Sequence, residues 1–136
     1  MGSVYLKPLH CGISVSNIQE SIKWYRNMLD FELVSCKDMT ELNSLVAFIR
    51  HGDFEIELFE HHNTIPLPIE RVVPNSDIQI QGTKHICFQV DDIVLLFERL
   101  DKKGADIVMG PQSMENALMG FIHDNNGTLI EFIQKL

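Results

Sequence analysis

The sequence is poor in the features that mark secreted and membrane-spanning proteins. Its three cysteines, Cys11, Cys36 and Cys87, are odd in number, show no C-x-x-C spacing and suit a reducing compartment. No apolar run is long enough to span a bilayer, and the amino terminus does not resemble a secretion signal. We therefore expect a cytoplasmic protein with no membrane partner.

Positive charge is also scarce. The 11 lysines and arginines are outnumbered by 19 acidic residues, which gives a net charge of −8 and argues against nucleic acid as a partner. The sequence contains no G-x-S-x-G, P-loop or G-x-G-x-x-G motif, which argues against the common classes of hydrolases and nucleotide-binding proteins. With 136 residues, 45% of them hydrophobic, the chain can bury a core, and we expect one compact domain over residues 1–136.

The sequence contains an internal duplication, in which one module occurs twice. An offset of 75 superposes His10 on His85, and an offset of 74 superposes Glu57 on Glu131. Each copy begins with an alternating strand, continues with helical spacing and ends with three strands. The fold class predicted is α+β, with two βαβββ modules in tandem that form a cupped mixed sheet. The modules span residues 9–60 and 84–134 and are joined by the linker 61–83.

Turn and cap residues set the expected boundaries. Asn17 stands three residues before Glu20 in a capping-box-like start, Asp91 or Asp92 can cap the second helix, and Gly104 ends it. The first module is predicted to have a helix at 18–29 and strands at 9–15, 31–39, 45–50 and 54–60. The second is predicted to have a helix from about residue 93 and strands at 84–90, 107–109, 118–123 and 129–133.

Strand alternation places the two histidines and the two glutamates on one face of the sheets, opposite the helices. Two neutral imidazoles and two carboxylates balance a divalent cation, and this mixed nitrogen and oxygen set suits Zn, Ni, Co, Mn or Fe(II). We therefore predict one metal ion held by His10, Glu57, His85 and Glu131. Alternation also predicts that the same face carries substrate-binding residues, namely Ser14, Gln89, Phe121 and His123.

Several segments of the chain resemble the vicinal oxygen chelate superfamily, which includes glyoxalase I, methylmalonyl-CoA epimerase, extradiol dioxygenases and the bleomycin and fosfomycin resistance proteins. The resemblance covers Leu9 to Ile133 and is carried by LHCGISV, SIKWYRNMLDFEL, EIELFE, KHICFQVDDI and NNGTLIEFI. It implies a glyoxalase-like fold. The order His, Glu, His, Glu is most similar to the ligand set of bacterial glyoxalase I.

The resemblance implies a divalent-metal-dependent lyase or isomerase of the glyoxalase I or epimerase type. Such an enzyme transfers a proton next to a carbonyl through a metal-bound enediolate. Glu131 is the first candidate for the catalytic base and Glu57 the second. Ni, Co and Zn are the first candidates for the metal, and Mn and Fe follow. A homodimer is expected because each module exposes sheet edges. The metal site can form within one chain or across the dimer, and the sequence leaves both open.

Two other functions stay open. An Fe(II) dioxygenase of the same superfamily would use three of the four ligands, and a resistance-type protein would bind a small molecule without turnover. The chain also departs from the relatives it resembles at three positions. Ser14 stands where glyoxalase I usually has Arg, His61 where it has Asn, and Lys84 where the epimerases have a second His. We therefore leave the small-molecule substrate open among glutathione adducts, other thiol adducts and 2-oxo or 2-hydroxy compounds.

Overall fold

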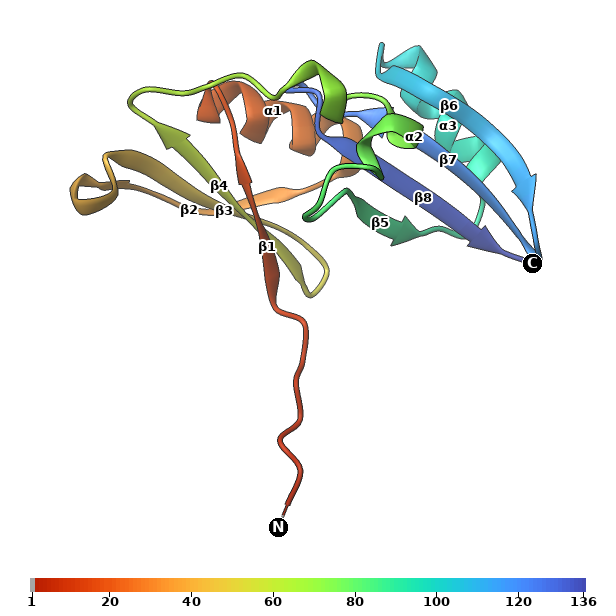
Figure 1. The fold of residues 1–136 in the computed structure, drawn as a ribbon, viewed down its shortest axis with the longest axis horizontal. Coiled ribbons are helices and arrows are strands. Elements are labelled where there is room, and N and C mark those ends of the chain that lie inside the picture. Colours follow the sequence, from red (N-terminus) through yellow and green to blue (C-terminus); the bar gives the residue numbers. More distant parts are fainter. Residues whose placement is uncertain (1) are drawn as a thin grey trace. The chain divides into compact units, whose positions relative to one another are not determined.

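The computed structural model describes residues 2–136, which divide into two compact units, the residues up to Ile65 and Pro66–Leu136. Each unit contains one four-stranded sheet (Figure 1). Within residues 2–136, no helix has the length and apolar character needed to cross a membrane. The predicted α+β class, with two βαβββ modules in tandem, is confirmed.

The first unit contains one helix and four strands. They are β1 (His10–Ser14), α1 (Ile18–Leu29), β2 (Glu32–Met39), the short 3-10 helix η1 (Thr40–Leu42), β3 (Ser44–His51) and β4 (Phe54–His61). The strand order is β1-β4-β3-β2, with β1 parallel to β4 and the other pairs antiparallel. The sheet is therefore mixed, and its first and last strands in sequence are neighbours.

The second unit repeats this order after two short helices. It contains η2 (Ile69–Arg71), α2 (Pro74–Asp77), β5 (Ile86–Gln89), α3 (Ile93–Lys102), β6 (Asp106–Met114), β7 (Ala117–His123) and β8 (Leu129–Lys135). The strand order β5-β8-β7-β6 matches that of the first unit, again with one parallel pair, β5 and β8. Most of the predicted linker thus belongs to the second unit.

The duplication extends to the way each long helix begins. The side chains of Asn17 and Asp92 accept hydrogen bonds, 3.0 Å long, from the third backbone N–H of α1 and α3. The last strand of each unit adds a second acceptor, because Glu60 binds the N–H of Ile18 at 2.6 Å and Gln134 binds the N–H of Ile93 at 2.9 Å. These bonds satisfy backbone donors that a helix start leaves open, so they tie each helix to its sheet.

Each helix covers one face of its own sheet. Helix α1 contacts β2, β3 and β4, and α3 contacts β6, β7 and β8. The helix faces carry apolar residues at helical spacing, and the sheet residues beneath them are also buried. In the second unit the packing is close at Gly120, where an added Cβ would lie 2.6 Å from the Phe97 ring. The opposite face of each sheet is left for the predicted site residues.

Two predicted boundaries in the second unit are wrong. The strand predicted at 107–109 extends to Met114, because β6 accommodates Gly110 and Pro111 with register shifts between Ile107 and Met109 and between Met109 and Gln112. The strand predicted to start at residue 84 starts at Ile86, whose partner is Ile130. Lys84 and His85 therefore precede β5.

Candidate metal centre

Each unit brings one histidine and one glutamate together. In the first unit the Nε2 atom of His10 lies 3.4 Å from Oε1 of Glu57, and in the second the Nε2 atom of His85 lies 3.1 Å from Oε1 of Glu131. In both units the glutamate comes from the final strand and the histidine stands at or just before the start of the neighbouring parallel strand. The four side chains are all partly exposed, so a ligand can reach them.

A phenylalanine completes the same arrangement in both units. Phe48 is the cross-strand partner of Glu57, and Phe121 is the cross-strand partner of Glu131. Each ring meets its histidine edge to face, with centroids 5.4 Å apart at 84° in the first unit and 5.1 Å apart at 87° in the second. Such contacts fix the plane of an imidazole. We call His10, Glu57 and Phe48 the first half-site, and the corresponding three residues of the second unit the second half-site.

The half-sites differ in what stands beside the glutamate. Cys87 is the strand partner of Glu131, whereas Gly12 is the strand partner of Glu57. Cys87 is exposed as a residue, but partial desolvation of its thiol raises its pKa, and the charge and hydrogen bond of Glu131 raise that pKa further, to about 12. A Cβ at Gly12 would lie 3.2 Å from the Phe59 ring, so that position has little room for a side chain.

Two of the predicted substrate-binding residues are exposed at equivalent strand ends. Ser14 ends β1 beside Phe59, and Gln89 ends β5 beside Ile133. Both lie in the strand register that carries the half-site residues, two positions beyond Gly12 and Cys87. Ser14 and Gln89 therefore alternate in phase with the histidines of the half-sites, as predicted, and whether they bind a substrate stays a prediction.

The other two predicted substrate-binding residues have contacts within the fold. Phe121 is 5% exposed and forms part of the second half-site. The Nδ1 atom of His123 lies 2.9 Å from Oδ2 of Asp106, and its Nε2 atom lies 2.7 Å from the carbonyl oxygen of Val72. A ligand would have to displace one of these two partners to bind the His123 ring directly.

His61, at one of the departures from glyoxalase I, lies at the end of β4. Its side chain is exposed, and its Nδ1 atom accepts a hydrogen bond of 2.9 Å from the N–H of Asn63. The Nε2 side of the ring faces away from that bond. His61 is therefore held in one orientation by its own turn.

The donor set of the half-sites fits a divalent cation. Imidazole nitrogen and carboxylate oxygen are the ligands that Zn²⁺ and its neighbours in the first transition row take in proteins. Each half-site supplies one of each, and within the residues that the structure describes neither unit by itself assembles three side chains able to hold a metal ion. Two half-sites are thus needed for a set of four ligands.

Sequence reasoning missed Phe48, although a signal was present. An offset of 73 superposes Phe48 on Phe121, one residue less than the offset between the glutamates. It also missed the pairing of Cys87 with Glu131, because the partner of a strand residue depends on a parallel register that only the fold provides.

The chain matches the family model of the Glyoxalase/Bleomycin resistance protein/Dioxygenase superfamily over residues 7–132. It is 30% identical to a lactoylglutathione lyase of Neisseria meningitidis, with 96% of this chain and 91% of that protein covered. It is also 30% identical to an ethylmalonyl-CoA/methylmalonyl-CoA epimerase of Cereibacter sphaeroides, with 92% of this chain and 95% of that protein covered.

The fold also matches solved structures. The crystal structure of glyoxalase I from Zea mays superposes with a TM-score of 0.76 at 23% identity over 95% of this chain. The chain spans only 44% of the maize protein, so that likeness concerns the fold. The matched family model covers every residue of both half-sites. The protein therefore belongs to the glyoxalase/bleomycin resistance protein/dioxygenase superfamily.

Proposed function

We propose that the protein is a divalent-metal-dependent lyase or isomerase that transfers a proton at a carbon next to a carbonyl. The observation that carries the proposal is the pair of equivalent half-sites, in which a histidine, a glutamate and a phenylalanine recur with the same contacts. The similarity to lactoylglutathione lyases and to an epimerase supports the reaction class. His10, Glu57, His85 and Glu131 would hold one metal ion.

The equivalence of the two glutamates favours four ligands over three. A dioxygenase-type site would use two histidines and one glutamate, and Glu57 would be surplus. However, Glu57 has the same contacts as Glu131: each glutamate lies beside the histidine of its half-site and is the strand partner of its phenylalanine. A surplus carboxylate would have no reason to keep this arrangement. The lyase and epimerase class is therefore the better supported alternative.

The metal site would be completed by joining one first half-site to one second half-site. The two can come from the same chain or from two chains of a homodimer. In either case the charge balances, because two carboxylates neutralise a divalent cation while the imidazoles stay neutral. The exposed edges of the four-stranded sheets give a physical reason for a dimer, since unpaired edge strands are otherwise open to uncontrolled association.

A bound divalent cation would supply Lewis acidity to two neighbouring oxygen atoms of the substrate. The proton itself would be moved by a carboxylate of this chain. Glu131 is the first candidate because its side chain is 12% exposed, compared with 24% for Glu57, so it reacts in the drier environment. Phe121 borders it and limits the access of water. Ser14 and Gln89 would orient the substrate through hydrogen bonds.

The substrate would be a small molecule with an acidic C–H beside a carbonyl. The names of the relatives point to hemithioacetals and to acyl thioesters. Ser14 and His61 carry no permanent positive charge with which to bind the carboxylates of glutathione. We therefore propose that the substrate is not restricted to glutathione adducts, and that hemithioacetals of glutathione and of other thiols are to be compared as substrates.

Three measurements test this function. The first is metal content per chain, on protein purified without a metal-affinity tag, for the wild type and for His10→Ala and His85→Ala. The second is exchange of the carbon-bound proton with solvent deuterium, followed by NMR for hemithioacetals of several thiols and for 2-methyl-3-oxo thioesters. The third is oxygen consumption.

We expect one metal ion per four-ligand site, loss of metal in both alanine variants and proton exchange without oxygen uptake. Metal-dependent oxygen uptake would instead identify a dioxygenase. Tight binding of a substrate with no exchange would identify a sequestering protein. Either result would overturn the proposed function.

A further inference from the structure

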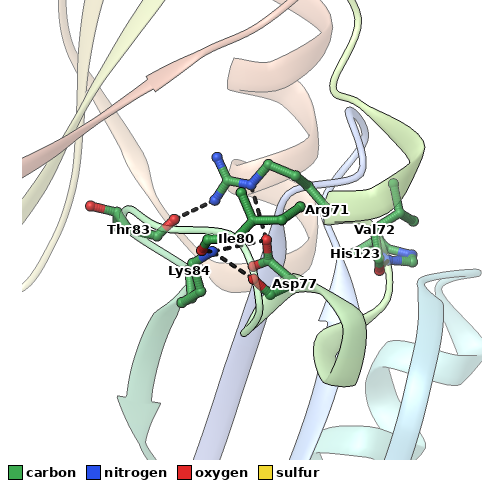
Figure 2. Close-up of polar contacts among 7 residues, drawn as sticks. All are labelled: Arg71, Val72, Asp77, Ile80, Thr83, Lys84 and His123. Carbon is green, nitrogen blue, oxygen red and sulfur yellow. Dashed lines mark hydrogen bonds and ion pairs between the residues drawn. The ribbon is translucent and has the colours of Figure 1, made fainter.

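A buried charge network lies immediately before the second half-site. Oδ1 of Asp77 accepts hydrogen bonds from Nε of Arg71 at 3.0 Å and from Nζ of Lys84 at 3.2 Å (Figure 2). Asp77 is 1% exposed, whereas the two cationic side chains are partly exposed. We call Arg71, Asp77 and Lys84 the Asp77 network. It joins the end of α2 to the residue that precedes His85.

Lys84 is fully occupied by this network. Its ammonium donates to Oδ1 of Asp77, to the carbonyl oxygen of Asp77 at 2.6 Å and to the carbonyl oxygen of Ile80. An ammonium has three N–H donors, so none is left for a substrate anion. Arg71 also donates through Nη2 to the carbonyl oxygen of Thr83 (Figure 2). Of the two residues before His85, Lys84 is thus bonded directly to the buried carboxylate, and Thr83 is linked to it through Arg71.

The network depends on both of its cations. Burial alone would raise the pKa of Asp77, but the hydrogen bonds and charges of Arg71 and Lys84 outweigh it and hold that pKa below its usual value. The second carboxylate oxygen, Oδ2, is buried and has no hydrogen-bond partner within residues 2–136. Removal of Lys84 would therefore leave a buried charge with one cation, which disfavours the present conformation of the segment.

The two histidines of the half-sites are held in different ways. His10 lies within β1, where its Cα is paired with that of Glu55, and the preceding Leu9 is 68% exposed. His85 lies before β5, whose pairing begins at the next residue. The strand ladder that positions the first histidine does not include the second, and Lys84 stands where the first module has Leu9.

A second contact braces the same segment. The carbonyl oxygen of Val72 accepts a hydrogen bond from Nε2 of His123 (Figure 2). His123 belongs to β7, the strand that also contains Phe121. The segment from Val72 to Lys84 is thus fastened at its start to the strand that carries the half-site phenylalanine, and its end is bonded back to Asp77 within the same segment. His85 follows directly on this fastened segment.

We propose that Asp77 is a positioning residue that acts through Lys84 to set the His85 ring against Glu131 and Phe121. The Asp77 network does for the second half-site what the pairing of β1 with β4 does for the first. The inference rests on the proposed function where it concerns metal affinity. The position of the His85 ring, however, can be measured without metal, because the ring lies 5.1 Å from Phe121 and its protons feel the aromatic ring current.

The metal-free arm of the test follows the ring protons of His85 and His10 by NMR in the full chain. We expect Lys84→Met, and the double variant Asp77→Asn/Lys84→Met, to move the His85 shifts toward those of an unstructured histidine. His10, which meets Phe48 at 5.4 Å, is the internal control and should not change. Lys102→Met removes the same charge from an exposed site on α3 and should change neither. Unchanged His85 shifts in the folded variants would overturn the proposal.

The metal arm measures Zn²⁺ affinity by competition with a chromophoric chelator. We expect a loss of about 10–100-fold for Lys84→Met and no loss for Lys102→Met. Ile93→Val, a substitution at a fully buried residue of the same unit, separates lost positioning from lost stability and should leave affinity unchanged. Displaced His85 shifts with unchanged affinity would contradict the proposal.

The two arms separate the failure of this proposal from that of the proposed function. If the wild type binds no metal, the proposed function fails, while the NMR arm still decides whether the network positions His85. The double variant removes both opposite charges, so it avoids the buried carboxylate that Lys84→Met leaves with Arg71 as its only cation. If neither variant folds, the network supports the whole unit rather than His85, and the proposal is wrong.

Discussion

The thiol of Cys87 offers a direct measure of the second half-site. Burial, the charge of Glu131 and the hydrogen bond to Glu131 raise its pKa from 9.0 to about 12. Only the thiolate attacks a disulfide reagent, so at pH 8 the reactive fraction falls by about a thousandfold. A thiolate of higher pKa is a better nucleophile, and with a Brønsted slope of about 0.4–0.5 this recovers roughly 15–30-fold. The net expectation is a reaction about 30–60-fold slower than that of an unperturbed thiol.

The assay uses metal-free protein in which Cys11→Ala and Cys36→Ser leave Cys87 as the single thiol. Its reaction with an aromatic disulfide is followed by absorbance as a function of pH. Glu131→Gln removes the negative charge, so the pKa of Cys87 should fall and the reaction at pH 8 should accelerate. The acceleration should be incomplete, because burial is the largest cause of the shift and remains.

Glu57→Gln is the matched control, since Glu57 has Gly12 as its strand partner and not a thiol. It should leave the rate unchanged. If wild-type Cys87 reacts at the rate of an unperturbed thiol, or if Glu131→Gln and Glu57→Gln have equal effects, then Glu131 does not lie against Cys87 and the described second half-site is wrong.

Four further predictions concern activity, packing, pH and assembly. Glu131→Gln should lower turnover by about 10²–10⁴-fold, and by more than Glu57→Gln, while metal stays bound; equal loss in both would contradict the assignment of the base. Gly120→Ala should cost about 1–3 kcal/mol in urea unfolding because its Cβ meets Phe97, whereas Gly110→Ala, with open space around it, should not. The pKa of Asp77 in the folded protein lies below its ordinary value of 3.8, so the stability that its charge contributes is present above pH 3.8 and is lost as the pH falls through the folded pKa. Asp77→Asn should therefore flatten the acid side of the plot of unfolding free energy against pH. An unchanged slope would refute this. Light scattering should give a particle larger than 15.6 kDa, and that mass at every concentration would exclude a dimer.

The elements of the fold could be predicted where periodicity and caps agreed. Asn17 and Asp92 cap the helices as expected, and both strand–helix–strand orders are present. The prediction failed where local signals conflicted with pairing. Gly110 and Pro111 indicate a break, yet β7 holds them in β6 through a shifted register.

For the site, strand alternation could predict only which face of the sheet each residue occupies. Alternation alone brought each histidine to the same face as its glutamate, and the structure places both pairs within 3.4 Å. It could not distinguish exposed Ser14 from His123, whose ring nitrogens are bound by Asp106 and Val72. Those partners come from distant elements, so the role of His123 is decided by tertiary contacts that no local pattern contains.

The two half-sites share three residue types but differ in the residues that support them. The histidine, the glutamate and the phenylalanine recur with the same contacts, which indicates that the geometry among these three is the constrained property. The supports around them differ. A strand ladder holds His10, whereas side chains hold the segment before His85.

Such a difference bears on the proposed proton transfer. Two carboxylates on one metal ion compete for the same role unless their surroundings distinguish them. Here Glu131 is less exposed and has a thiol beside it, whereas Glu57 is more exposed and has a glycine as its strand partner. Under the proposed function, the duplication would supply the four ligands. The residues that differ between the copies, Cys87 beside Glu131 and Gly12 beside Glu57, would then distinguish the glutamate that acts as base from the one that acts only as ligand.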